Sequence, residues 1–183
     1  MLVREVRWSD FDDISRFYFH LYDERARGDP IGITLFDERP SVADEVQWFG
    51  QMYREVLLGT RCFAVAEVDG RVVGDCSISR ASPFVTSETS HVGVLGIIVA
   101  EEHRGRGVGS ALLRHALEWA RSRFEVVRLS VFSVNEGAHR LYLRFGFVDC
   151  GRIPRAIRRG TTYYDELHMA LVFPPGATGA GKH

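Results

Sequence analysis

Hydrophobic and polar residues follow two different periods along this chain. Segments with the period of a strand alternate with segments with the period of a helix, and this predicts one mixed α/β domain. Apolar residues at every second position, or in a short unbroken run, predict strands, whereas apolar residues three or four apart predict helices. The expected strands cover residues 2–7, 62–68, 72–80, 92–99, 126–132, 147–150 and 161–173. The expected helices cover residues 10–21, 41–58, 110–122 and 137–145. This order favours a sheet covered by helices.

Turn and capping residues mark several boundaries between these elements. Ser41, followed three positions later by Asp44, is close to a capping box and predicts the start of the second helix. The dipeptide Asp69-Gly70 between two predicted strands indicates a tight β-hairpin. Residues 23–40 show no period and contain two prolines and two glycines. We therefore expect a long loop there, and loops of this length in compact domains are often functional.

The C-terminal third contains two segments without a clear period. Residues 152–160 are rich in arginine and are expected to form a basic connection. Pro174-Pro175 begins a glycine-rich tail over residues 174–183, which we expect to be disordered. No internal repeat or linker divides the remainder, so we expect a single domain over residues 1–173.

Composition narrows the classes of partner. The formal net charge of the 183 residues is −1, which argues against a nucleic-acid partner. Charged residues interrupt every apolar run, and the first residues alternate as a strand does, so we expect neither a membrane span nor a signal peptide, and a cytoplasmic protein. Three widely spaced cysteines, Cys62, Cys76 and Cys150, indicate reduced thiols and no metal site.

The segment from Arg104 to Gly109, with the sequence Arg-Gly-Arg-Gly-Val-Gly, carries the strongest chemical signal. It lies between the apolar strand at 92–99 and the helix that begins near Ser110. A helix start presents unpaired backbone N–H groups and the positive end of the helix dipole. Glycines allow the backbone to approach an anion closely, and the two arginines add charge. The segment therefore predicts a phosphate-binding turn, with an ordinary strand-to-helix turn as the alternative.

Two other nucleotide-binding interpretations fail. Residues 176–182 match the first seven positions of a phosphate-binding loop, but His183 stands where a magnesium ligand is required and no helix follows. The spacing of Gly105, Gly107 and Gly109 differs from that of the dinucleotide-binding fingerprint, and the unit lies in the middle of the chain.

Two motifs, separated by one helix and one strand, point to a known family. After an apolar strand, Arg104, Gly107 and Gly109 match (Gln/Arg)-x-x-Gly-x-(Gly/Ala). The second motif is Asn135-x-x-Ala138-x-x-Leu141-Tyr142-x-x-x-Gly146-Phe147. In both, the chain resembles the GNAT family of N-acetyltransferases. The resemblance implies an α/β fold with a mostly antiparallel twisted sheet of six to seven strands, splayed between the fourth and fifth strands, and about four helices.

The resemblance also implies the cosubstrate acetyl-CoA and no metal. The pyrophosphate would rest on the glycine-rich turn, and the pantetheine arm would pair with the backbone of the preceding strand and with Asn135. That strand must then lack a full partner along one edge, and its N–H groups could stabilise an oxyanion. The implied binding residues are Ile97, Ile98, Val99, Arg104, Gly105, Arg106, Gly107, Val108, Gly109, Ser110 and Asn135.

Tyr142 is the candidate general acid. Acyl transfer from a thioester expels a thiolate, and a phenol within hydrogen-bond reach can protonate it. In the GNAT family the tyrosine at this motif position often has this role. The alternative is that Tyr142 only packs the helix against the cofactor.

The general base departs from the family pattern. Several members carry Glu or His on the fourth strand, at positions that correspond to Gly93 and Leu95, and some N-terminal acetyltransferases carry Glu at the position of Ser130. None of these residues can accept a proton. His91 lies two residues before Gly93 and is the candidate base. Otherwise the proton would pass through water to Glu88, Asp75 or an acidic residue of the loop at 23–37.

The resemblance implies an N-acetyltransferase, and we expect the acceptor to be the primary amine of a small molecule. A protein or peptide N-acetyltransferase and a non-catalytic acyl-CoA-binding module remain alternatives. Acceptor identity should depend on residues 23–40, 81–90 and 152–159. The last segment could recognise an acidic substrate group, bind CoA phosphates or form a homodimer surface, through Arg152, Arg155, Arg158 and Arg159.

Overall fold

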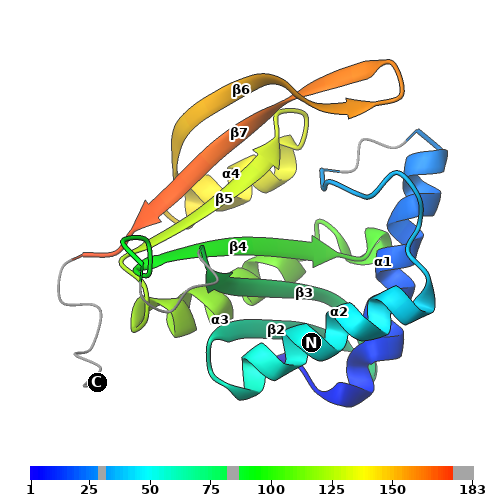
Figure 1. Ribbon diagram of the computed structural model, residues 1–183, viewed down its shortest axis with the longest axis horizontal. Helices are drawn as coiled ribbons and strands as arrows, with labels where there is room; N and C mark the ends of the chain where they lie inside the picture. Colours follow the sequence, from blue (N-terminus) through cyan, green and yellow to red (C-terminus); the bar gives the residue numbers. More distant parts are fainter. Residues whose placement is uncertain (29–31, 82–86, 175–183) are drawn as a thin grey trace.

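Seven strands form one sheet in the computed structural model, which describes residues 1–28, 32–81 and 87–174 (Figure 1). The strands are β1 (Leu2–Glu5), β2 (Arg61–Val68), β3 (Arg71–Arg80), β4 (Val92–Val99), β5 (Val126–Phe132), β6 (Val148–Arg159) and β7 (Thr162–Val172), in the order β1-β2-β3-β4-β5-β7-β6. The helices of the described residues are α1 (Phe11–Ala26), α2 (Val42–Leu57), α3 (Val108–Arg121) and α4 (Glu136–Arg144), with short 3₁₀ turns at Trp8–Asp10 and Glu101–His103. The expected fold is confirmed.

The sheet is antiparallel except where β4 meets β5. These two strands are parallel and pair only at their beginnings, where Val92, Gly93 and Val94 face residues 126–128. Beyond Val94 they separate, and the gap between them widens toward the carboxyl end of β4 (Figure 1). The splay expected between the fourth and fifth strands is confirmed.

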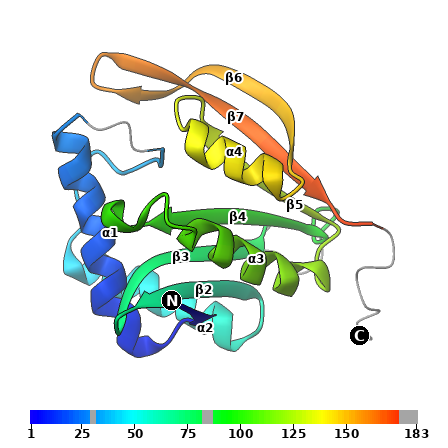
Figure 2. The same ribbon diagram turned by 180° about the vertical axis from the view of Figure 1, so that it is seen from behind.

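Helices cover both faces of the sheet. α3 and α4 lie on one face, and α1 and α2 lie on the other (Figures 1 and 2). The buried stripe of α3 packs on the central strands through Leu112, Leu113, Ala116, Leu117 and Ala120. A second cluster joins α1 and α2 to the sheet through Ile14, Phe17, Phe49, Met52, Phe63 and Val65. No helix within the described ranges is long and apolar enough to cross a membrane.

The predicted local signals are confirmed where the structure describes them. Ser41 caps α2 by accepting a hydrogen bond from the Asp44 N–H, and the Asp44 carboxylate accepts one from the Ser41 N–H. The turn between β2 and β3 holds Asp69 and Gly70 at φ values of 51° and 77°. These positive values explain why this dipeptide specifies the hairpin.

One predicted connection is wrong. The basic segment at 152–160 belongs to β6, which pairs along its length with β7. β6 lies at the edge of the sheet and almost all of its residues are exposed. It therefore lacks the alternation of buried and exposed positions that predicts a strand. The tail prediction, including the phosphate-loop match at 176–182, lies outside the described residues.

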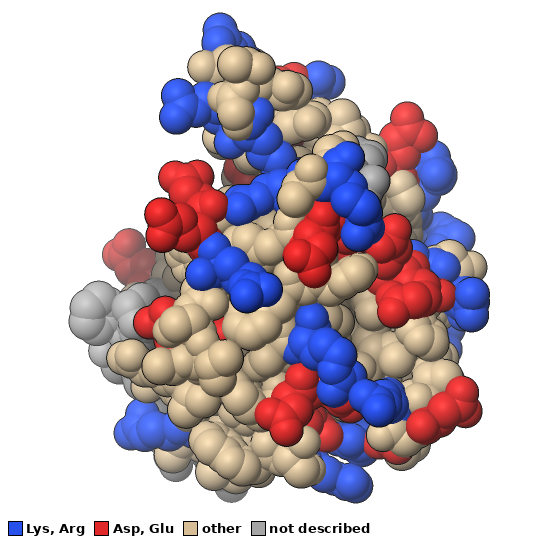
Figure 3. All heavy atoms as spheres, turned by 90° about the vertical axis from the view of Figure 1, so that its right-hand side faces the viewer, with Lys and Arg blue, Asp and Glu red and all other residues tan. Residues whose placement is uncertain are grey.

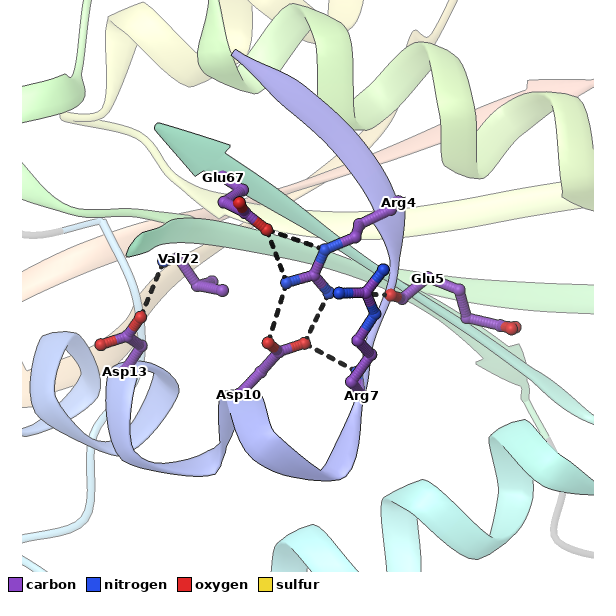
Figure 4. A network of polar contacts seen from close by, with 7 residues as sticks. All are labelled: Arg4, Glu5, Arg7, Asp10, Asp13, Glu67 and Val72. Atoms are coloured by element: carbon purple, nitrogen blue, oxygen red, sulfur yellow. Dashed lines mark hydrogen bonds and ion pairs between the residues drawn. The ribbon is translucent and has the colours of Figure 1, made fainter. Parts of the chain in front are cut away.

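An arginine network fastens the N-terminal strand to the start of α1 (Figure 4). The Arg4 guanidinium donates two hydrogen bonds to Asp10, at 2.7 and 2.9 Å, and Arg4 Nε donates to Glu67 on β2 at 2.9 Å. The Arg7 N–H also donates to Asp10. Burial alone would raise the pKa of Asp10, but the bonds from Arg4 and Arg7 outweigh it and lower that pKa.

Replacing Arg4 by methionine should destabilise the fold by about 3 kcal/mol, because it leaves the buried Asp10 carboxylate without its charged partner. The pKa of Asp10 is lowered on folding. The contribution of its carboxylate to the free energy of unfolding is therefore fully present above about pH 4 and is lost as the pH falls through the folded pKa. Denaturant unfolding at pH 7 and pH 3 measures both effects. An equal destabilisation at the two pH values would contradict the charge argument.

Candidate active site

A cleft of about 970 Å³ opens where β4 and β5 separate. Its walls come from the second half of β4, the end of β5, the turn before α3 and the inner face of α4. Residues 32–34, from the segment between α1 and α2, also line it. The two motifs recognised in the sequence therefore line a single cavity.

The turn between β4 and α3 has the backbone conformation that its glycines predict. Gly105 and Gly107 have φ values of 71° and 85°, in the left-handed region that glycine adopts at little cost. A Cβ at either position would meet open space, so backbone conformation rather than crowding requires glycine. Gly109 differs, since a Cβ there would lie 3.2 Å from Leu141 on α4. The first N–H groups of α3, from Val108 on, face no carbonyl within the helix.

Arg104 fastens this turn to the rest of the fold. Its Nε donates to the Val99 carbonyl at 2.9 Å, and its two terminal nitrogens donate to both carboxylate oxygens of Glu24 at 2.6 and 2.9 Å. Glu24 lies on α1 and is almost completely buried. Arg104 lines the cleft, but its charge is matched by Glu24. It therefore acts on the turn mainly by holding its position.

The other predicted binding residues of the turn divide into two groups. Gly105, Gly107, Gly109 and Ser110 line the cleft together with Arg104. Val108 is instead buried in the core, and Arg106 is exposed outside the lining. Two arginines that the sequence motifs did not single out, Arg140 and Arg144 on α4, do line the cleft.

The second half of β4 presents a free backbone edge to the cleft. Ile97, Ile98 and Val99 line it, and their strand pairs with β3 on the other side only. Across the cleft, Asn135 caps α4 by accepting a hydrogen bond from the Ala138 N–H at 3.1 Å. The Asn135 amide also packs against Gly32, where a Cβ would lie 1.9 Å from its nitrogen. Residues 32–34 are thus held directly over the cleft.

Tyr142 lies on the inner face of α4 and lines the cleft. Its side chain is buried and packs against Phe147, with ring centroids 5.8 Å apart. Desolvation, with a smaller effect of the neighbouring Cys76, raises the pKa of the phenol well above its usual value. The phenol is therefore protonated at neutral and moderately alkaline pH, as a proton donor must be.

The structure does not bring the candidate base His91 into the cleft. His91 is exposed before β4, at the closed end of the splay, where its carbonyl accepts hydrogen bonds from the N–H groups of Glu125 and Val126. Gly93 is buried, and a Cβ there would lie 2.9 Å from the Phe124 ring, so the position cannot hold a base. Leu95 is buried in the core as well as lining the cleft.

The suggested proton relays also lie elsewhere. Glu88 is exposed in the turn before β4, and Asp75 is buried on β3 outside the cleft lining. Of the acidic residues in the segment at 23–37, Glu24 is paired with Arg104, Asp23 and Asp37 are exposed, and residue 29 lies outside the described residues.

One carboxylate lines the cleft among the described residues, and the sequence did not single it out. Glu166 on β7 lies opposite Phe132 of β5 in the sheet register. Its side chain is 23% exposed, and its Oε2 lies 3.1 Å from His168 Nε2, without hydrogen-bond alignment. Ser130, which pairs with His168, also lines the cleft. The sequence motifs did not indicate Glu166, because β7 and β5 are distant along the chain and become neighbours only in the folded sheet.

One group of potential metal ligands occurs in the part of the chain that the structure describes. Ligand atoms of His20, Glu24 and Glu101 lie within 4.8 Å of one another near the glycine-rich turn. Arginines already pair with both carboxylates, Arg104 with Glu24 and Arg27 with Glu101. We interpret the group as part of the ion-pair network that joins α1 to the turn.

Comparison with known proteins places this geometry in context. A model described as the acetyltransferase (GNAT) family matches residues 33–147, which is more than half of the chain. A streptothricin acetyltransferase of Streptomyces lavendulae is 33% identical over 118 residues, covering 63% of this chain and 59% of the relative. An L-amino acid N-acetyltransferase of Escherichia coli is 34% identical over 110 residues, covering 59% and 66%. This chain thus spans about three fifths of the length of these relatives.

Solved structures agree on the fold. A Salmonella typhimurium protein solved with its cofactor acetyl-CoA superposes with a TM-score of 0.82 at 21% identity, covering 99% of this chain and 98% of that one. At 21% identity this similarity shows the fold alone.

Proposed function

Because this chain belongs to the acetyltransferase (GNAT) family, we propose that it transfers the acetyl group of acetyl-CoA to the primary amine of a small molecule. The observation that carries the proposal is the convergence, in one cleft, of the glycine-rich turn, the free edge of β4 and the Tyr142 phenol.

The described residues fit the cosubstrate. Left-handed Gly105 and Gly107 and the start of α3 suit a pyrophosphate, with Arg140 and Arg144 as nearby cations. The unpaired edge of β4 suits a pantetheine arm, whose amides can complete the missing ladder. Acetyl-CoA, when bound, supplies a thioester carbonyl for attack and a sulfur that leaves.

Three parts of the chain then divide the chemistry. Backbone N–H groups on the free edge of β4 stabilise the carbonyl oxygen as it gains negative charge. Tyr142 donates its phenolic proton to the departing sulfur as the C–S bond breaks. Glu166 accepts the proton that the amine loses as the new C–N bond forms, and both residues then exchange protons with solvent. Tyr142 and Glu166 lie on different elements of one cleft, which supports these separate roles.

Replacing Glu166 by glutamine should lower kcat/KM for the amine about 100-fold at pH 7, because an aliphatic amine with a pKa near ~10 must lose a proton to react. The deficit should shrink as the pH rises, since hydroxide and water then remove the proton. A pH profile of CoA thiol release measures this. Glu118→Gln, on the exposed side of α3, is the charge-matched control. A variant within threefold of the wild type at pH 7 would exclude Glu166 as the base.

Residues 32–34, which lie along the cleft, favour a small acceptor. Gly32 packs against Asn135, and the Ile33 carbonyl accepts a hydrogen bond from Arg159 on β6 at 2.6 Å. Residues 32 and 33 are thereby attached to the side of the splay formed by β5, β7 and β6. A cleft that is partly covered in this way suits a free amine better than a segment of a folded protein.

The proposal is tested in two steps with the full chain. Acetyl-CoA should raise the melting temperature, because it binds the native state selectively. A thiol-release screen should then find turnover with small primary amines and little with peptides or lysine side chains. Turnover with peptides alone would instead indicate a protein acetyltransferase. A thermal shift without any turnover would indicate a binding module, and absence of the shift would overturn the acetyl-CoA assignment.

A further inference from the structure

Two arginines from distant parts of the chain meet the same short segment beside the cleft. Arg159, at the end of β6, donates from Nη2 to the Ile33 carbonyl at 2.6 Å. Arg25, in the last turn of α1, donates to the carbonyls of Phe36 and Asp37 at 2.7 and 2.8 Å. All three acceptors are backbone carbonyls, and neither guanidinium contacts a carboxylate within the described residues. Their charges therefore remain unmatched.

Of the two arginines, Arg159 has the contacts with residues that line the cleft. It is half-buried, with its guanidinium 4.8 Å from the ring centroid of Phe132 and 5.9 Å from that of Tyr164. Phe132 and Ile33, both in contact with Arg159, line the cleft. Burial, together with the nearby charge of Arg25, lowers the pKa of Arg159. A partly desolvated cation beside another cation is costly without an anion.

Neighbouring arginines do not share this position. Arg152 is paired with Asp165, and Arg155 stacks on Tyr163, with its guanidinium 4.1 Å from the ring centroid. In the register of the hairpin, Arg158 lies opposite Tyr163 and Arg159 opposite Thr162, so the two adjacent arginines point to opposite faces of the sheet. Of these four arginines, Arg159 is the one beside the cleft.

The surrounding surface does not supply a general positive field. Figure 3 shows arginine side chains interspersed with Asp and Glu side chains over the face that carries α1 and the tip of the β6–β7 hairpin. Selection of an anion at the cleft must therefore come from particular groups. A guanidinium with free N–H donors can bind a carboxylate or another oxyanion in bidentate geometry.

The candidate base lies close to this cation. Glu166 is the register partner of Phe132, and Arg159 covers the ring of the same Phe132. A proton acceptor and an unmatched cation thus flank one aromatic side chain at the cleft. Both groups can therefore act on one bound molecule that carries an amine and an anionic group.

We propose that Arg159, supported by Arg25, forms an anion subsite that selects acceptors whose reactive amine is accompanied by a carboxylate or a similar oxyanion, as in an amino acid. The inference rests on the proposed function and specifies its substrate class. The acceptor amine would face Glu166 and its anionic group would face Arg159.

Acceptor pairs that differ only in the anionic group provide the test. The full chain is assayed by thiol release with an amino acid, its carboxamide and its aminophosphonate analogue. The wild type should prefer the carboxylate over the carboxamide. Arg159→Gln should reduce this preference about 30-fold, mainly through the KM of the carboxylate acceptor. The KM of acetyl-CoA should not change. Comparing ratios between variants cancels the intrinsic reactivity of each amine, and the phosphonate distinguishes a general oxyanion site from a carboxylate site.

Two further variants sharpen the result. Arg158→Gln removes the same charge from the adjacent position on the opposite face and should leave the preference intact. Arg25→Gln should weaken it less than Arg159→Gln does. If Arg159 only holds the Ile33 segment, Arg159→Gln will impair the carboxylate and the carboxamide equally, which would overturn the inference.

A measurement on the wild type covers the case in which Arg159→Gln does not fold. A carboxylate that lacks the amine should inhibit competitively against the acceptor, and its carboxamide should not. Equal transfer to carboxylate and carboxamide would overturn this inference and leave the proposed function standing. Absence of transfer to every amine would overturn both.

Discussion

Tyr142→Phe should lower kcat by about 1000-fold while leaving the dissociation constant of acetyl-CoA within threefold of the wild type. The substitution removes one hydroxyl from a buried side chain that lines the cleft and keeps the ring that packs on Phe147. The leaving thiolate then has no positioned proton donor. Because the pKa of the phenol is raised, the wild type should not lose activity at moderately alkaline pH through ionisation of Tyr142.

Tyr53→Phe is the matched control. Tyr53 lies in the aromatic cluster of α2, with its ring centroid 5.4 Å from that of Trp8, and outside the cleft lining. Turnover by thiol release and acetyl-CoA affinity by calorimetry separate chemistry from binding. If Tyr142→Phe weakened acetyl-CoA binding and left kcat unchanged, Tyr142 would be a packing residue, which is the alternative that its sequence motif left open.

The site divides into features that local sequence encodes and features that only the sheet creates. The glycine-rich turn and the cap of α4 by Asn135 depend on neighbouring residues, so the motifs predicted their positions. Glu166 lines the cleft because β7 pairs with β5, and Arg159 lies beside the cleft because β6 is the next strand in the sheet. That order is absent from the linear pattern, which did not single out Glu166 and offered Arg159 only as one of four arginines with several possible roles.

Two site residues predicted from the sequence lie in surroundings that the local sequence did not indicate. His91 was favoured from its position on the strand, but the strand is paired with β5 at that end and separates at the other. Arg104 was expected to add positive charge to the turn, but its charge is paired with Glu24, which lies 80 residues earlier in the chain. In both cases the residue's surroundings are set by a segment distant along the chain, β5 for His91 and α1 for Arg104.

Asp75→Asn should stabilise the fold by up to about 4 kcal/mol at pH 8 and have little effect near pH 4. Asp75 lies on β3 between Val65 of β2 and Ile98 of β4, is buried, and receives no hydrogen bond to its carboxyl group from the described residues. Desolvation raises its pKa from 3.8 to about 7. The native state therefore binds this proton more tightly than the unfolded state. Stability falls as the pH rises from about 4 to about 7, at about 1.4 kcal/mol per unit, and is level above.

Denaturant unfolding of the wild type and Asp75→Asn between pH 4 and pH 9 isolates this contribution, because other titrating groups cancel in the difference. Asp12→Asn, an exposed position in the first turn of α1, controls for the loss of one negative charge. A constant difference across the pH range would contradict the raised pKa. Since Asp75 lies outside the cleft lining, the asparagine variant should also keep its turnover, whereas a proton relay through Asp75 would make it lose activity at every pH.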